Sequence, residues 1–130
     1  MSKQKIIAFD LDDVICFRDS QYENLGPKKY DYCQPYPETI KIVNSLYDEG
    51  HKIIVYTARG MSQFDGDVQL IYENLYEKTK EHLKGWGLKY HSLVMGKIHY
   101  DVLIDDKALN SKDIDKKLIE NLIGYESNIN

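Results

Sequence analysis

The feature that most constrains this chain is an apolar run that leads directly into three carboxylates. Residues 6–9 read Ile-Ile-Ala-Phe, and Asp10, Asp12 and Asp13 follow within four positions. A buried strand over residues 5–10 would deliver this charge to one edge of the fold, and side-chain alternation would turn Asp10 and Asp12 toward the same point. Mg2+ accepts one or two carboxylates together with water and phosphate oxygens, so the stretch predicts a metal and a phosphate. An acidic turn after a buried strand is the competing interpretation.

Length and composition exclude several classes of protein. The 130 residues suffice for one domain, 1–130, and are too few for a large separate lid. The net charge of -4 argues against a general nucleic-acid partner. No apolar run approaches a membrane span, and residues 1–5 lead into the first strand without a cleavage site, so we expect a cytoplasmic protein with no membrane partner. Cys16 and Cys33 are too few for a disulfide framework and are expected to be reduced.

Apolar periodicity predicts strands alternating with helices. The expected elements, in chain order after the first strand, are a helix at 37–50, a strand at 52–57, a helix at 68–87, strands at 92–95 and 102–104, and a helix at 110–124. Leu118 and Leu122 are expected to face inward, and the tail 125–130 to fray. The predicted fold class is α/β, a Rossmann-like open, mostly parallel sheet with flanking helices, its first strand covered on both faces.

Residues 17–36 interrupt this alternation. They contain two prolines and the tyrosines Tyr22, Tyr30, Tyr32 and Tyr36, which is typical of a long ordered loop. Such loops inside compact domains are often functional, so this Tyr-rich loop is a candidate substrate loop. The alternative is that its aromatic rings only anchor a surface excursion to the core.

Polar residues recur wherever a predicted strand ends. Asp10 and Asp12 end the first strand, Thr57 the second, Lys97 follows the third, and the fourth ends in the doublet Asp105-Asp106. In an open parallel sheet, ligands bind beyond the carboxyl ends of the strands. Thr57 alone would be an ordinary strand residue and Lys97 alone a solvated lysine. It is their common placement that predicts a site.

In this order the residues resemble the motifs of the haloacid dehalogenase (HAD) superfamily of phosphatases. Asp10-Leu11-Asp12-Asp13-Val14 is similar to the first motif, Thr57 to the second, Lys97 to the third and Asp105-Asp106 to the fourth. The resemblance implies a Mg2+-dependent phosphomonoester hydrolase that works through an aspartyl-phosphate. It implies the following roles: Asp10 as nucleophile, Asp12 as general acid and base, Thr57, Ala58 and Lys97 as phosphate ligands, and Asp10, Asp12 through its carbonyl, Asp105 and Asp106 as ligands of Mg2+.

Two further residues are candidates for the substrate rim. Arg59 directly follows the Thr57 motif, although pairing with a neighbouring carboxylate is an equal expectation for it. His99 lies close to Lys97. Independently of the resemblance, phosphate ester hydrolysis requires the residue types found in the motifs. It needs a carboxylate that attacks phosphorus, a second carboxyl that transfers protons, and fixed donors for the phosphoryl oxygens.

The short intervals between the motifs indicate a phosphatase without a cap domain. The chain is most similar to small capless bacterial phosphatases of capsule and lipopolysaccharide biosynthesis, which implies a small, sugar-linked phosphorylated substrate and allows for a homo-oligomer. Because the doublet Asp105-Asp106 also occurs in polynucleotide 3'-phosphatases, an end-phosphate of a polynucleotide or nucleotide is the alternative substrate. A receiver-like signalling domain is less consistent, since Thr57 stands where a receiver carries its phosphoacceptor aspartate.

Overall fold

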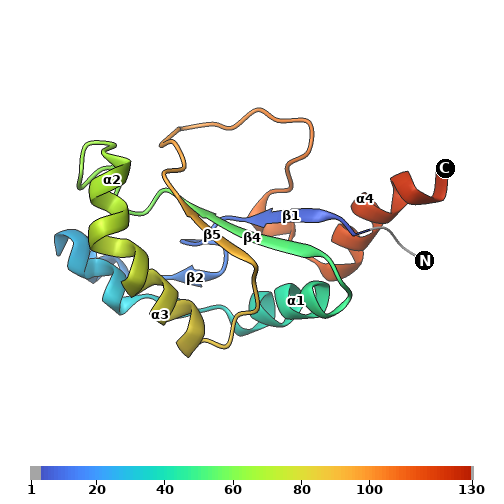
Figure 1. Ribbon diagram of the computed structural model, residues 1–130, viewed down its shortest axis with the longest axis horizontal. Helices are drawn as coiled ribbons and strands as arrows, with labels where there is room; N and C mark the ends of the chain where they lie inside the picture. Colours follow the sequence, from blue (N-terminus) through green and yellow to red (C-terminus); the bar gives the residue numbers. More distant parts are fainter. Residues whose placement is uncertain (1–3, 130) are drawn as a thin grey trace.

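The computed structural model describes residues 4–129, with side chains through residue 124, and shows an α/β fold built on a small parallel sheet (Figure 1). The sheet has the order β1-β4-β5, with β1 at Ile6–Phe9, β4 at Lys52–Thr57 and β5 at Ser92–Met95. Phe9 lies opposite Val55, and Thr57 lies opposite Met95. The three strands therefore end side by side, as the sequence predicts.

Two helical segments connect these strands. The first, α1 at Pro37–Asp48, begins with proline at its first position, and Gly50 follows its end with a φ of 97°. The second is one long helical run that contains a π turn, and its parts are α2 at Val68–Ile71, η3 at Tyr72–Tyr76 and α3 at Glu77–Gly85. Both connections fall where the apolar periodicity predicts them, whereas the π turn was not predicted.

The core lies on one face of the sheet. Buried residues alternate with more exposed ones along β4 and β5, and the buried set comprises Ile53, Val55, Thr57, Leu93 and Met95. The stripe facing them from the helices comprises Ile40, Val43, Leu46, Ile71, Leu75, Thr79 and Leu83. On the other face Ile6, Tyr56 and Val94 are exposed. The prediction that β1 is covered on both faces is therefore wrong, because the connecting helices lie on the same side of the sheet (Figure 1).

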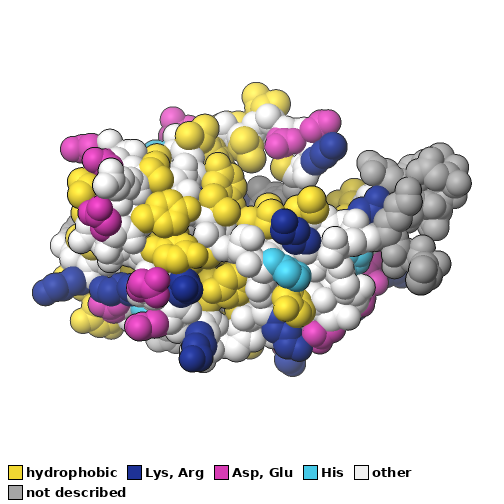
Figure 2. Space-filling view, in the orientation of Figure 1, with side chains coloured by type: hydrophobic (Ala, Val, Ile, Leu, Met, Phe, Trp, Pro, Cys, Tyr) yellow, Lys and Arg dark blue, Asp and Glu magenta, His cyan; other side chains and the backbone are white. Residues whose placement is uncertain are grey.

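The predicted fourth strand at 102–104 is also wrong. Residues 96–110, all of them described, contain no strand and form an arch that stands off the sheet (Figure 1). Val102 and Ile104 are 74% and 93% exposed. Figure 2 shows hydrophobic side chains along this arch. The apolar pattern therefore marks a segment able to form a strand, but it is not paired in this arrangement, and β1 remains an edge strand.

The Tyr-rich loop is ordered by its own small elements. These are an antiparallel pair, β2 at Cys16–Phe17 with β3 at Gln34–Pro35, and two 3-10 helices, η1 at Ser20–Tyr22 and η2 at Gly26–Tyr32. The rings of Tyr22 and Tyr32 stack with their centroids 4.1 Å apart, and Tyr30 is buried. Packing therefore accounts for at least three of the four tyrosines.

The last part of the chain packs less fully than its periodicity predicts. Asn110 caps a short 3-10 helix, η4 at Ser111–Asp113, and α4 follows at Lys116–Ile129. This helix runs through Gly124, so the predicted stop there is wrong, while residue 130 lies outside the described part. Ile119 is buried and Leu122 is 55% exposed, which corrects the inward assignment of Leu122. None of the described helices has the length and apolar character needed to cross a bilayer.

Leu83 and Leu122 offer a matched test of where the core lies. Leu83→Ala removes a fully buried side chain of α3 and should lower the free energy of unfolding by about 2–5 kcal/mol. Leu122→Ala removes the same atoms from an exposed position on α4 and should cost well under about 1 kcal/mol. Urea unfolding followed by circular dichroism measures both. Equal losses would show that Leu122 is buried as deeply as Leu83.

Candidate active site

The ends of the three strands open onto one cavity. It has a volume of about 380 Å³, and its lining includes seven residues that the sequence predicts for the site: Asp10, Asp12, Thr57, Ala58, Arg59, Lys97 and His99. Their sequence positions span most of the chain, and the parallel register of the sheet brings them together. Asp105 and Asp106 are absent from the lining.

An ion pair joins the first and third strand ends. Lys97 Nζ lies 3.0 Å from Asp10 Oδ2, and both side chains are partly buried. The backbone N–H of Lys97 donates to the carbonyl oxygen of Thr57 at 3.1 Å, which ties this lysine to the end of β4. Burial alone would lower the pKa of Lys97, but contacts with Tyr100 and Asp10 outweigh it and raise that pKa. The cavity therefore holds a fixed ammonium directly beside the Asp10 carboxylate.

A tight turn after β4 forms the middle of the cavity wall. Thr57 is buried, and its hydroxyl oxygen accepts a hydrogen bond from the Arg59 backbone N–H at 3.1 Å. The next residue, Gly60, has a φ of 83°, and its N–H donates to the Tyr30 hydroxyl at 3.0 Å. A Cβ at Gly60 would lie only 2.7 Å from the Leu75 side chain. This turn therefore requires glycine, and Tyr30 holds it in place.

Arg59 turns inward and binds Asp12. Its Nε and Nη2 lie 3.0 Å and 3.2 Å from the two Asp12 carboxylate oxygens, which is a bidentate pairing. The guanidinium is fully buried, and the Tyr30 ring lies over it at 4.7 Å. Of the two expectations for Arg59, the structure favours the ion pair over the substrate rim.

The Arg59 pair determines the charge of Asp12. Burial alone would raise the pKa of Asp12, but the attraction and hydrogen bonds of Arg59, with a smaller effect from Arg18, lower it overall. Asp12 is therefore ionised in this arrangement, and its lowered pKa makes it a weaker base than an ordinary carboxylate. Donating a proton to a leaving group would first require the guanidinium to loosen its hold.

The structure does not bring Asp105 and Asp106 to this cavity. Both lie in the exposed arch 96–110, and Asp105 Oδ1 accepts a hydrogen bond from the Lys107 backbone N–H at 2.9 Å. This local contact, together with Asp106, lowers the pKa of Asp105. Of the four residues predicted to bind Mg2+, Asp10 and Asp12 line the cavity, and Asp105 and Asp106 do not.

The donor chemistry distinguishes two places for a cation. Asp10 presents carboxylate oxygens to the cavity, which suits Mg2+ with water and phosphate oxygens as its other ligands. The second place is a cluster of Asp12, Cys16 and Cys33, whose ligand atoms all lie within 4.8 Å of one another. Guanidinium nitrogens of Arg59 and Arg18 contact the two sulfurs, and this positive charge opposes a metal there.

Sequence reasoning missed several residues of the cavity wall. These are Asp13, Arg18, Lys29, Tyr30, Ser62, Gln63 and Ile98. Tyr30 belongs to the Tyr-rich loop that the sequence singles out, but it is the one tyrosine of that loop in the lining, and it is buried. Arg18 and Lys29 both pair with Glu23, at 2.7 Å and 3.4 Å, and no local signal marks them as cavity residues.

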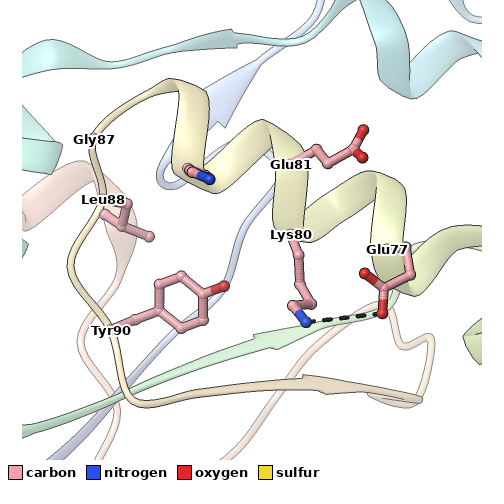
Figure 3. A pocket seen from close by; sticks show the side chains of 7 residues that line it. Glu77, Lys80, Glu81, Gly87, Leu88 and Tyr90 are labelled. Carbon is pink, nitrogen blue, oxygen red and sulfur yellow. Dashed lines mark ion pairs between the residues drawn. The ribbon is translucent and has the colours of Figure 1, made fainter.

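A second cavity lies away from the strand ends, along α3 and the turn that follows it (Figure 3). Its volume is about 590 Å³, and its charged lining side chains are two glutamates and two lysines of the helix surface. Lys80 pairs with Glu77 at 3.8 Å. Charges of both signs side by side on a helix are typical of a solvated surface, so we do not assign a site there.

Of the comparisons with known proteins, the one with solved structures bears on the fold. Neither the family models nor the curated proteins that were searched match this chain. Among solved structures, the chain is similar to an MCSG target from Vibrio cholerae, with a TM-score of 0.74 and 24% identity. The alignment covers 95% of this chain and 99% of the other. This likeness supports the α/β fold over nearly the whole length.

Removing the buried cation should destabilise the protein strongly. Arg59→Leu leaves the Asp12 carboxylate without its partner and should lower the free energy of unfolding by about 3–5 kcal/mol at neutral pH. Lys78→Leu is the matched control, because Lys78 and Asp31 form a far more exposed pair at 3.2 Å, and it should cost about 1 kcal/mol or less. Urea unfolding measures both variants.

The pH dependence separates charge from packing. Since the folded pKa of Asp12 lies below its ordinary value of 3.8, the stabilisation by Arg59 is present above 3.8 and is lost as pH falls through the folded pKa. The difference in stability between wild type and Arg59→Leu should therefore narrow in strong acid. A difference that stays constant with pH would mean that Arg59 acts through its packing alone.

Proposed function

We propose that this protein is a Mg2+-dependent phosphomonoester hydrolase of the HAD type, in which Asp10 attacks phosphorus and forms an aspartyl-phosphate. The observation that carries the proposal is the 3.0 Å contact between Lys97 Nζ and Asp10 Oδ2 on the wall of a cavity at the strand ends. A nucleophilic carboxylate has to be ionised, and a neighbouring ammonium favours that form. The same ammonium would stabilise the phosphoryl oxygens as Asp10 attacks.

The turn after β4 would complete the phosphate site. Thr57 and Ala58 line the cavity beside Lys97, so a hydroxyl and backbone groups are available close to the ammonium. Fixed donors of this kind need little reorganisation when charge develops on the transferring group. Phosphoryl transfer depends mainly on such positioning and charge stabilisation.

Asp12 would serve both proton transfers in this scheme. In its ionised form it can accept a proton from the water that hydrolyses the aspartyl-phosphate. Protonating the leaving alkoxide requires the acid form, which the Arg59 ion pair disfavours until that pair loosens. Arg59 thus sets when Asp12 can act as an acid.

Mg2+ would be held first by Asp10. Bound there, the ion would neutralise charge on the phosphoryl oxygens. The arch 96–110 carries Asp105 and Asp106, its apolar residues Val102 and Ile104 are exposed, and β1 has an unpaired edge. Pairing of residues 102–104 along that edge would bury these side chains and move both carboxylates toward the end of β1. We include this closure in the proposal as the route by which Asp105 and Asp106 join the metal.

The substrate we propose is a small, sugar-linked phosphate ester. The cavity of about 380 Å³ suits a compact ligand, and Tyr100 and His99 on its wall could contact polar groups beyond the phosphate. A polynucleotide end-phosphate remains the alternative. It is supported less well, because two basic residues of the wall, Arg18 and Lys29, already pair with Glu23.

Two substitutions separate the steps of the proposed reaction. With p-nitrophenyl phosphate, whose leaving group needs little help from an acid, Asp12→Asn should still release an initial burst of p-nitrophenol about equal to the enzyme. Its steady-state turnover should then be lower than wild type by about 10²-fold or more, because hydrolysis of the intermediate lacks its base. Asp10→Asn should show neither burst nor turnover. Stopped-flow absorbance in Mg2+ measures both phases.

The control variant is Asp48→Asn, which changes an exposed aspartate of α1 that pairs with Lys89 and should behave as wild type. Excess chelator should stop turnover of the wild-type protein, and added Mg2+ should restore it. Wild-type rates in Asp10→Asn would contradict the covalent route. Full activity in chelator would contradict the role of the metal.

A further inference from the structure

Two cysteines contact the same oxygen of the Asp12 carboxylate. Cys16 Sγ and Cys33 Sγ are 3.5 Å and 3.6 Å from Asp12 Oδ1, and the two sulfurs and this oxygen all lie within 4.8 Å of one another. Both residues are free cysteines and both are buried. The two thiols are therefore close enough to react with each other after a small local movement.

Cys16 lies in β2 and Cys33 directly precedes β3, and the pairing of these two strands explains the proximity of the sulfurs. In the β2–β3 pair, Cys16 lies opposite Pro35 and Phe17 opposite Gln34, so Cys33 is the diagonal neighbour of Cys16 on the same face. Diagonal neighbours have Cα atoms about 7–8 Å apart, whereas a disulfide usually needs them at about 4.4–6.8 Å. A pair of two-residue strands at the edge of a loop can close by about 1 Å without disturbing the main sheet.

We propose that Cys16 and Cys33 form an oxidisable dithiol that a peroxide converts to an intramolecular disulfide in the folded protein. Cys33 would react first, because it is 9% exposed and Cys16 is fully buried. A metal is the less suitable occupant of this place, since Arg18 Nη1 lies 3.3 Å from one sulfur and Arg59 Nη2 lies 3.7 Å from the other.

The reaction balances with the peroxide as oxidant. The deprotonated sulfur of Cys33 attacks one peroxide oxygen, the O–O bond breaks, and the departing oxygen leaves as hydroxide and becomes water, so that Cys33 holds a sulfenic acid. The sulfur of Cys16 then displaces that oxygen, which forms the S–S bond and a second water. In total, two thiols are oxidised and one peroxide is reduced to two waters. A dithiol reductant reverses the change by thiol–disulfide exchange.

Disulfide formation would reach the cavity through Asp12. The sulfur of Cys16 contacts both Asp12 Oδ1 and Arg59 Nη2, so moving it shifts two partners of the bidentate pair. Under the proposed function, which this consequence assumes, Asp12 transfers protons. The oxidised protein is then expected to lose phosphatase activity by about 10-fold or more, and the dithiol would act as a reversible switch.

The direct test counts thiols and needs no substrate. The full-length protein is treated with hydrogen peroxide, its remaining thiols are alkylated in denaturant, and its intact mass is measured. We expect the thiol count of the wild type to fall from two to zero, with a loss of about 2 Da, no dimer, and full recovery in dithiothreitol. Cys16→Ala and Cys33→Ala each retain one thiol and cannot form the internal disulfide, so neither variant should lose about 2 Da. Far-UV circular dichroism checks that the oxidised protein remains folded.

The outcomes decide the inference separately from the proposed function. Persistent free thiols, sulfinic acid without a disulfide, or disulfide-linked dimers in place of the internal bond would each overturn it. Activity is measured on reduced wild type first, so an inactive reduced enzyme counts against the proposed function alone. An internal disulfide with unchanged activity would overturn the link to Asp12. Loss of activity on peroxide treatment in the wild type, but not in Cys33→Ala, would support that link.

Discussion

The buried ion pair between Arg59 and Asp12 is the interaction on which the arrangement of the site depends. Arg59 follows β4 and Asp12 follows β1, so the pair fastens together the two turns that form the cavity wall. The same guanidinium also contacts Thr79 and His82 of α3 and lies under the Tyr30 ring. One charged side chain therefore links both strand ends, the helix behind them and the Tyr-rich loop. A charge buried this deeply is tolerated because nearly every donor it carries has a partner.

This pair also determines what the rest of the site can do. With Asp12 held by Arg59, the carboxylate of Asp10 is left facing Lys97, and the two aspartates acquire different surroundings two residues apart. Such a division suits a nucleophile and a proton carrier. The disadvantage is that Asp12 is ionised at rest and lacks the proton that a general acid must donate. The two thiols contact Oδ1 of the Asp12 carboxylate, so changes in their chemistry are expected to reach the ion pair.

Local patterns in the sequence were sufficient to place Asp10, Thr57 and Lys97 at one edge of the sheet. Apolar runs identify the strands, and strand–helix–strand order requires parallel pairing, so these strand ends had to meet. Contacts between distant residues carry no such signal: Arg59 and Asp12 are 47 positions apart, and both thiol contacts depend on the course of the Tyr-rich loop. Residues 102–104 have the composition of a strand, but composition does not determine which strand, if any, a segment pairs with. The carboxylates of Asp105 and Asp106, which follow these residues, were consequently assigned to a site from which the described arch holds them apart.

The most direct measurement is a crystal structure of the protein grown with Mg2+ and beryllium fluoride, which mimics a phosphoryl group on an aspartate. The account predicts beryllium bonded to a carboxylate oxygen of Asp10, its fluorides near Lys97 Nζ and the Thr57 hydroxyl, and the metal bound by Asp10 with Asp105 or Asp106 drawn in beside it. Beryllium fluoride on a different aspartate, or a cavity that stays empty at saturating concentrations of both, would contradict the assignment of Asp10 as the group that accepts phosphate.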